Sequence, residues 1–87
     1  MATTHPVSID KMTYDPNSLS VAAGDTVVWT NKMSMAHTAT ADDGSFDSGP
    51  IRSNKTFSYT FDAAGAVPYH CDYHPDMTGN VDVRASG

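Results

Sequence analysis

The stretch Tyr69–Met77 reads Tyr-His-Cys-Asp-Tyr-His-Pro-Asp-Met and contains the only cysteine of the chain, Cys71. A thiol, an imidazole and a thioether follow one another at three-residue intervals, as Cys71, His74 and Met77. Thiolate, neutral imidazole and thioether are soft or borderline donors that suit copper as it cycles between its two oxidation states. The spacing therefore indicates a copper site that takes three of its donors from one short segment.

A fourth donor must come from elsewhere in the chain, and His37 is the best candidate. Trigonal copper sites combine two histidines and one cysteine with a long axial methionine. The simpler interpretations are a buried, unreactive Cys71 and a surface-exposed His37. The histidine and methionine that follow Cys71 favour ligation by the thiol, whereas no local spacing links His37 to it.

The length of 87 residues predicts one domain spanning residues 1–87, with flexible ends at residues 1–5 and 85–87. A core of this size is close to the lower limit for stability without help, and a bound metal would stabilise it. The single cysteine excludes an intrachain disulfide. The net charge of −5 argues against nucleic-acid binding, which requires a basic surface.

Residue usage predicts an all-β fold. All ten acidic residues are aspartate, glutamine is absent and leucine occurs once, so the strong helix formers are largely missing. Short runs rich in valine, threonine and aromatic residues alternate with turn-forming Asp, Asn, Gly, Pro and Ser. Seven or eight short strands of this kind predict a two-sheet sandwich. The expected strands are Val7–Tyr14, Leu19–Val21, Thr26–Asn31, Thr56–Phe61, Val67–Cys71 and a closing strand around Val81–Val83.

Side-chain alternation along a strand predicts which residues face the core. The strand at residues 56–61 carries its three aromatic residues on one face, which should be buried. In the strand that ends at Cys71, the thiol shares a face with Tyr69 and points away from His70. We therefore expect Cys71 to face inward.

No apolar run in the sequence is long enough to span a bilayer, and no signal sequence is recognisable. Copper redox proteins mostly work outside the reducing cytosol. We therefore expect a soluble protein in the periplasm or another extracytoplasmic space, with any signal or anchor absent from this sequence.

Taken together, these features resemble the cupredoxin family of blue copper proteins. The spacing Cys-x-x-His-x-x-Met, preceded by Tyr-His, resembles the amicyanin-like members in particular. The resemblance extends from Val7 to Arg84 and includes the segments Ala23–Asn31, Phe46–Gly49 and Thr56–Phe61. It implies a Greek-key sandwich in which one ligand lies on an early strand and three lie on the loop between the last two strands.

By this resemblance, His37, Cys71 and His74 are the equatorial ligands and Met77 is the axial ligand of one type 1 copper ion. The protein would act as a soluble one-electron carrier between redox partners and would not be an enzyme. A rigid ligand set changes little between Cu(II) and Cu(I), which keeps the reorganisation energy of electron transfer low. Thr38, next to the upstream ligand, is expected to hydrogen-bond within the site.

The sequence departs from the amicyanin loop at three positions. Asp72 and Tyr73 stand where amicyanins have threonine and proline, and Asp76 stands where they have an apolar aromatic residue. Two carboxylates beside His74 make the expected docking surface more acidic. We therefore expect a monomeric carrier whose redox partner has complementary positive charge, such as a basic cytochrome, with a dehydrogenase or an oxidase as further partners.

Two other functions would use the same donors. A periplasmic or extracellular copper chaperone or scavenger would release Cu(I) readily, whereas an electron carrier retains it. The thioethers of Met33 and Met35, which precede His37, would bind Cu(I), but an apolar rim around a blue copper site is their preferred interpretation. An enzyme that acts on a small molecule is disfavoured, because Met77 would block the open coordination position.

The remaining polar candidates have simpler interpretations. His70 precedes Cys71, as does the histidine that binds a second, catalytic copper in copper nitrite reductases, but alternation favours a surface position for it. His5 is expected to be solvated near the N-terminus. Asp42 and Asp43 are expected to be solvated turn residues. No catalytic constellation is recognisable.

Overall fold

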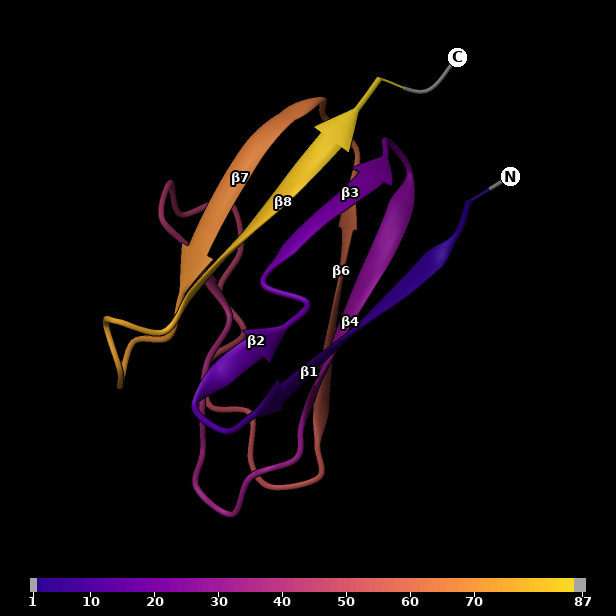
Figure 1. Cartoon of the computed structure of the whole chain (residues 1–87). Helices are drawn as coiled ribbons and strands as arrows, with labels where there is room; N and C mark the ends of the chain where they lie inside the picture. Colours follow the sequence, from indigo (N-terminus) through magenta and orange to yellow (C-terminus); the bar gives the residue numbers. More distant parts are fainter. Residues whose placement is uncertain (1, 86–87) are drawn as a thin grey trace.

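The computed structural model describes residues 2–85, which form eight β-strands in two four-stranded sheets and no helix (Figure 1). Among these residues there is accordingly no helix of the length and hydropathy that would cross a membrane. The prediction of an all-β, two-sheet sandwich is confirmed. The strands are β1 (Thr4–Asp10), β2 (Thr13–Asp15), β3 (Ser18–Ala22), β4 (Asp25–Asn31), β5 (Thr40–Ala41), β6 (Thr56–Phe61), β7 (Gly65–His70) and β8 (Thr78–Arg84).

The chain alternates between the two sheets. One sheet has the order β2-β1-β4-β6 and the other has the order β3-β8-β7-β5. The pairs β1–β4 and β3–β8 are parallel, and the other neighbouring pairs are antiparallel. From β3 to β7, each strand lies in the opposite sheet from the strand before it. The β4–β5 and β7–β8 connections, which carry the candidate ligands, are therefore anchored at both ends by paired strands.

The core lies between the sheets and is centred on Trp29 of β4, which is fully buried. Its ring lies 5.4 Å from the rings of Phe46 and Tyr69 and 5.7 Å from that of Phe57, measured between centroids. Aromatic pairs of this kind contribute about 0.5–1.5 kcal/mol each beyond the area they bury. Phe61 is buried in the same cluster, so the predicted aromatic face of β6 packs onto the core.

The prediction of one continuous strand over Val7–Tyr14 is wrong. The chain reverses at Lys11 and Met12, and β1 and β2 form an antiparallel hairpin in which Ile9 faces Tyr14. Both turn residues have positive φ, 52° and 61°. A two-residue turn of this hand usually contains asparagine or glycine, and Lys-Met carries neither signal.

The expected flexible end at residues 1–5 is also too long. Thr4 and His5 belong to β1 and lie opposite Thr26 and Val27 of β4. These two residues therefore pair in register with a central strand, as the rest of β1 does. At the other end, β8 stops at Arg84, and the expectation for residues 86–87 falls outside the described residues.

His5 was expected to be solvated, but its side chain is only 23% exposed and pairs with Asp25. Its Nε2 lies 2.9 Å from Oδ2 of Asp25. The same carboxylate accepts hydrogen bonds from the backbone N–H groups of Thr3 and Ala22, at 2.9 and 3.0 Å. These contacts, led by the hydrogen bond to His5, lower the pKa of Asp25 to about 2. Asp25 thus ties the start of β1 and the end of β3 to β4.

Candidate metal centre

Cys71, His74 and Met77 lie on the β7–β8 loop, which is folded by backbone hydrogen bonds. The N–H of His74 donates to the carbonyl of Cys71 at 3.3 Å, and the N–H of Met77 donates to the carbonyl of His74 at 2.9 Å. A third bond, from the N–H of Cys71 to the carbonyl of Met77 at 3.0 Å, closes the loop. Each three-residue step of the motif is therefore one turn, which explains how the spacing gathers its side chains.

His37 reaches the same place from the β4–β5 connection. Its backbone forms a two-bond bridge with Ile51, with N···O distances of 3.1 and 2.7 Å. The His37 and Cys71 side chains are fully buried, whereas His74 is only partly buried. Nδ1 of His37 lies 3.7 Å from Sγ of Cys71, and Nδ1 of His74 lies 3.8 Å from it. The three donor atoms all lie within 4.8 Å of one another.

These separations match a metal-binding geometry. A metal ion about 2.0 Å from each nitrogen and about 2.3 Å from the sulfur, with ligand angles of about 120°, separates nitrogen from sulfur by about 3.7 Å. The structure places the nitrogens of His37 and His74 at that distance from Cys71. The donor set of two imidazoles and one thiol therefore fits a trigonal metal site in both of its nitrogen–sulfur separations.

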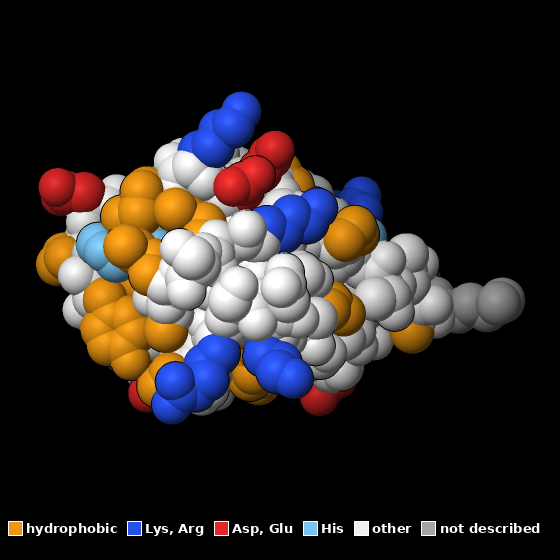
Figure 2. All heavy atoms as spheres, turned by 90° about the horizontal axis from the view of Figure 1, so that it is seen from below, with side chains coloured by type: hydrophobic (Ala, Val, Ile, Leu, Met, Phe, Trp, Pro, Cys, Tyr) orange, Lys and Arg blue, Asp and Glu red, His pale blue; other side chains and the backbone are white. Residues whose placement is uncertain are grey.

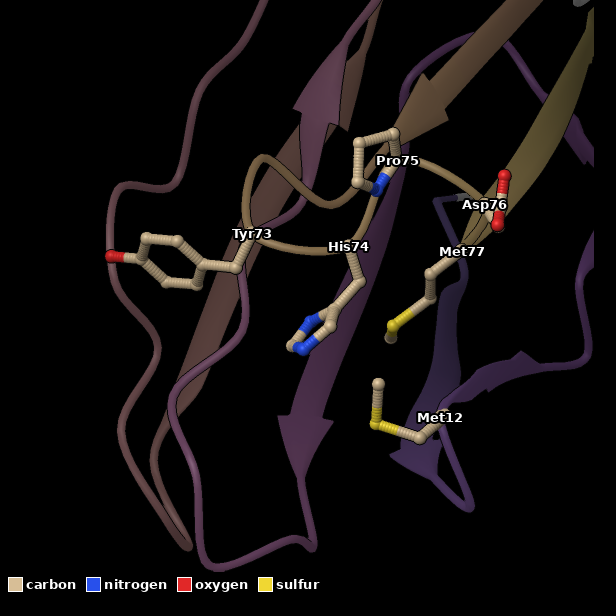
Figure 3. A pocket seen from close by; sticks show the side chains of 6 residues that line it. All are labelled: Met12, Tyr73, His74, Pro75, Asp76 and Met77. Carbon is tan, nitrogen blue, oxygen red and sulfur yellow. The ribbon is translucent and has the colours of Figure 1, made fainter.

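Met77 is 4% exposed and completes the loop beside this cluster. Its side chain lies next to the imidazole of His74 (Figure 3), and both side chains line one pocket. The structure therefore brings the fourth predicted residue to the edge of the three-donor cluster. All four candidate residues lie at the same end of the molecule.

The protonation state of His37 suits a ligand. Burial, and then the nearby charge of His74, lower the pKa of His37 below its usual value. A neutral imidazole offers an unprotonated nitrogen to a metal when its proton sits on the other nitrogen. Nε2 of His37 is buried and has no hydrogen-bond partner within residues 2–85. Nδ1 is the nitrogen that faces the sulfur.

Thr38 connects the two ligand-bearing segments, as predicted. Its backbone N–H donates to Sγ of Cys71 at 3.4 Å. Its hydroxyl oxygen accepts a hydrogen bond from the backbone N–H of Asp72 at 2.9 Å. A hydrogen bond to the sulfur withdraws electron density from it, which tunes the properties of any metal bound there.

Asp42 and Asp72 are exposed, as expected for turn residues, but both carboxylates also pair with His70. Nδ1 of His70 pairs with Asp42, and Nε2 lies 3.0 Å from Oδ1 of Asp72. The hydrogen bond to Asp42 is the main cause of a raised pKa of His70. The carboxylate of Asp72 thus faces His70. The pairing of β5 with β7, which brings Asp42 to His70, has no local signal in the sequence.

A pocket of about 340 Å³ lies where His74 approaches the surface, and we call it the His74 pocket. Figure 2 shows hydrophobic side chains gathered around histidine atoms at one end of the molecule, with charged side chains at the margins. Met12 comes from the β1–β2 turn, and the sequence analysis did not identify it, because the turn itself was missed. The residues that line the pocket are Met12, Tyr73, His74, Pro75, Asp76 and Met77.

Comparison with known proteins identifies the family. A family model described as copper binding proteins, plastocyanin/azurin family, matches residues 1–84. Amicyanin from Paracoccus denitrificans is 39% identical over 83 residues, and amicyanin-alpha from Methylorubrum extorquens is 36% identical over 88 residues. Each alignment covers 90% of this chain. The chain spans 63% of the length of the first relative and 70% of the second.

Solved structures give the same result. A Cu(I) form of an amicyanin variant superposes with a TM-score of 0.87 at 34% sequence identity, covering 93% of this chain and 82% of that chain. An oxidised amicyanin variant gives the same TM-score and identity, covering 92% and 81% of the two chains. With a cluster of two histidines and one cysteine at one end, this chain therefore belongs to the plastocyanin/azurin family of copper-binding proteins.

Proposed function

We propose that this protein is a one-electron carrier that holds a single type 1 copper ion through His37, Cys71, His74 and Met77. The first three residues would be the equatorial ligands and Met77 the axial one. The observation that carries the proposal is the convergence of two imidazole nitrogens and one thiol within 4.8 Å in a largely buried site. Copper bound there supplies a redox couple that exchanges one electron without making or breaking bonds in a substrate.

The surrounding residues hold the ligands in place. The backbone bridge to Ile51 fixes His37, and the loop hydrogen bonds fix Cys71 and His74. Thr38 joins the two segments through its N–H and its hydroxyl group. A ligand set held by packing and hydrogen bonds needs little rearrangement when the oxidation state changes, which favours fast electron transfer.

His74 provides the route to a partner. His37 and Cys71 are fully buried, whereas His74 is partly exposed and lines an open pocket. An electron would enter or leave through the imidazole of His74 while the partner covers the His74 pocket. The net charge of −5 and the exposed Asp76 favour a partner with a basic surface, such as a cytochrome, and a dehydrogenase or an oxidase is a further candidate.

We place this carrier, as a monomer, in the periplasm or another extracytoplasmic space, because an oxidising compartment suits a copper thiolate. The chaperone alternative requires rapid release of copper, and two fully buried donors oppose that. Enzymatic activity requires an open coordination position, which Met77 would cover. The electron carrier is therefore the function that best accounts for the arrangement.

Addition of Cu(II) to the purified protein tests the proposal. We expect an intense visible thiolate-to-copper charge-transfer band at one copper per chain. Cys71→Ser should abolish the band, whereas Tyr73→Phe, which changes an exposed neighbour and no donor, should retain it. A colourless protein, or a band that survives Cys71→Ser, would contradict the proposal. Slow self-exchange combined with easy loss of Cu(I) to a competing chelator would favour the chaperone instead.

A further inference from the structure

The described residues contain four methionines, two of which line the pocket at the candidate copper site. Met12 and Met77 line the His74 pocket together. The sulfur of Met33 accepts a hydrogen bond from the backbone N–H of Met12 at 3.4 Å. Met35 is two residues from His37 in sequence and is 47% exposed. The proposed copper site uses only Met77, so the other three thioethers lack a role.

The loop that carries two of these methionines is held by a buried amide. Asn31 is fully buried at the end of β4. Its Oδ1 accepts a hydrogen bond from the N–H of Met33 at 2.9 Å, and its Nδ2 donates to the carbonyl of Met35 at 2.8 Å. Nδ2 also donates to the carbonyl of Ile51 at 2.8 Å, which joins the loop to the bridge that holds His37. Both methionines therefore project from fixed backbone positions.

The β1–β2 turn presents Met12 from the opposite side. Positive φ values at Lys11 and Met12 reverse the chain, and Met12 remains 39% exposed. Figure 3 shows the thioethers of Met12 and Met77 pointing toward one another across the pocket, beside the imidazole of His74. The thioethers of Met12 and Met77 therefore lead from the exposed rim of the pocket to the edge of the buried donors, and the sulfur of Met33 contacts the backbone of Met12.

We propose that Met12, Met33 and Met35 form a loading site that captures Cu(I) at the surface and passes it to the buried ligands. This inference rests on the proposed copper site. Thioethers are soft, neutral donors that select Cu(I) over Cu(II) and Zn²⁺. Because His37 and Cys71 are buried, incoming copper would pass His74 and Met77, and Met12 faces Met77 across the pocket at that point.

The transfer is an exchange of ligands without redox chemistry. Bonds from Cu(I) to thioether sulfur break as bonds to imidazole nitrogen and to the Cys71 sulfur form. The metal stays in the same oxidation state, and the thiol proton of Cys71 is released to solvent. Cu(II) and Cu(I) would therefore load by different routes, since thioethers assist only the reduced ion.

Loading kinetics of the apoprotein test the inference. Cu(I) is supplied anaerobically as its bicinchoninate complex, and the loss of that complex's absorbance is followed by stopped flow. In the triple variant Met12→Leu/Met33→Leu/Met35→Leu we expect Cu(I) loading to slow by about tenfold, the effect of roughly 1.4 kcal/mol on a barrier. Leucine keeps the apolar surface and removes only the sulfur. Cu(II) loading, final stoichiometry and the visible band should remain as in the wild type.

Tyr73→Leu is the matched control, because it changes another exposed side chain of the His74 pocket without removing a sulfur. It should load Cu(I) at the wild-type rate. An unchanged Cu(I) rate in the triple variant, or equal slowing for Cu(I) and Cu(II), would overturn the inference. A wild-type protein that forms no visible band would instead refute the proposed function, so the two failures are distinguishable.

A second readout is independent of the final site. In Cys71→Ser protein labelled with ¹³C at the methionine methyl groups, addition of Cu(I) under ascorbate should shift the NMR signals of Met12 and Met33. Signals that stay in place at stoichiometric Cu(I) would contradict capture by thioethers.

Discussion

At the scale of single residues, the structure depends on residues that each form hydrogen bonds to separate segments of the chain. Thr38 is the clearest case, because its N–H donates a hydrogen bond to the Cys71 sulfur and its hydroxyl oxygen accepts one from the N–H of Asp72. Asp25 plays a comparable part at the other end of the molecule. Its carboxylate accepts hydrogen bonds from the backbone N–H groups of Thr3 and Ala22 and pairs with the imidazole of His5. Loss of either side chain should therefore affect more than its own position.

Thr38→Ala removes the hydroxyl group but leaves the N–H that reaches the sulfur. The N–H of Asp72 then loses its acceptor, and we expect the free energy of unfolding of the apoprotein to fall by about 1 kcal/mol. Urea denaturation measures this change. Thr60→Ala, at an exposed hydroxyl pair with Thr26, is the control and should cost less. Equal costs for the two variants would contradict the proposed role of Thr38.

The lowered pKa of Asp25 predicts how the free energy of unfolding changes at acidic pH. Its pKa in the folded protein is about 2, below the ordinary value of 3.8. As the pH falls, the unfolded chain binds the proton first, so the stability that Asp25 contributes is constant above about pH 5 and is lost between about pH 4 and pH 2. Asp25→Asn should lose this component of the decline, as measured by urea denaturation of the apoprotein at a series of pH values. Parallel curves for the two proteins would exclude the proposed role of Asp25.

At the scale of elements, the hairpin of β7 and β8 supports the ligand loop. Tyr69 of β7 lies opposite Gly79 of β8, and its ring occupies the space where a side chain at Gly79 would project. A Cβ added at Gly79 would lie 2.5 Å from the Tyr69 hydroxyl oxygen. The absence of a side chain at Gly79 therefore lets the ring of Tyr69 pack into the core beside Cys71.

Gly79→Ala should displace the Tyr69 ring and destabilise the apoprotein by about 1–3 kcal/mol, as expected for overpacking. Chemical denaturation measures this change. A double-mutant cycle with Tyr69→Leu provides the control, because the cost of the alanine should shrink once the ring is gone. Additive costs in the cycle would show that the contact between these residues is not the cause.

The elements also show what can be predicted from sequence. The Cys-x-x-His-x-x-Met segment was identified because each step is a local turn, and local geometry is encoded by nearby residues. His37 joins Cys71 only through the distant bridge to Ile51, so family resemblance was needed to select it. The β1–β2 turn was missed because Lys11 and Met12 adopt positive φ without the usual residues. The contacts of His70 were missed because they depend on cross-strand register.

At the scale of the whole molecule, charge is distributed unevenly around the proposed docking surface at the His74 pocket. The chain carries a net charge of −5. Asp76 lines the His74 pocket, whereas the carboxylate of Asp72 is engaged by His70 and by the hydroxyl group of Thr40. Of the two loop carboxylates, Asp76 is therefore the one available to a partner that covers His74.

This difference predicts unequal effects on electron transfer to a basic cytochrome. Asp76→Asn should reduce the bimolecular rate at low ionic strength by a few-fold and weaken its salt dependence, because a rim charge mainly steers association. Asp72→Asn is the matched control and should change the rate less. Stopped-flow measurements over a range of ionic strength provide the test. A wild-type rate that does not depend on salt would rule out electrostatic docking.

The proposed function requires one copper ion bound by two imidazoles and a thiolate drawn from two distant segments. X-ray absorption at the copper edge of the loaded protein tests it most directly, since the spectrum counts sulfur and imidazole ligands. The account predicts one short sulfur contact and two imidazoles in the wild type, and one imidazole fewer in His37→Gln. A first shell without sulfur, or an unchanged number of imidazoles in His37→Gln, would contradict the account.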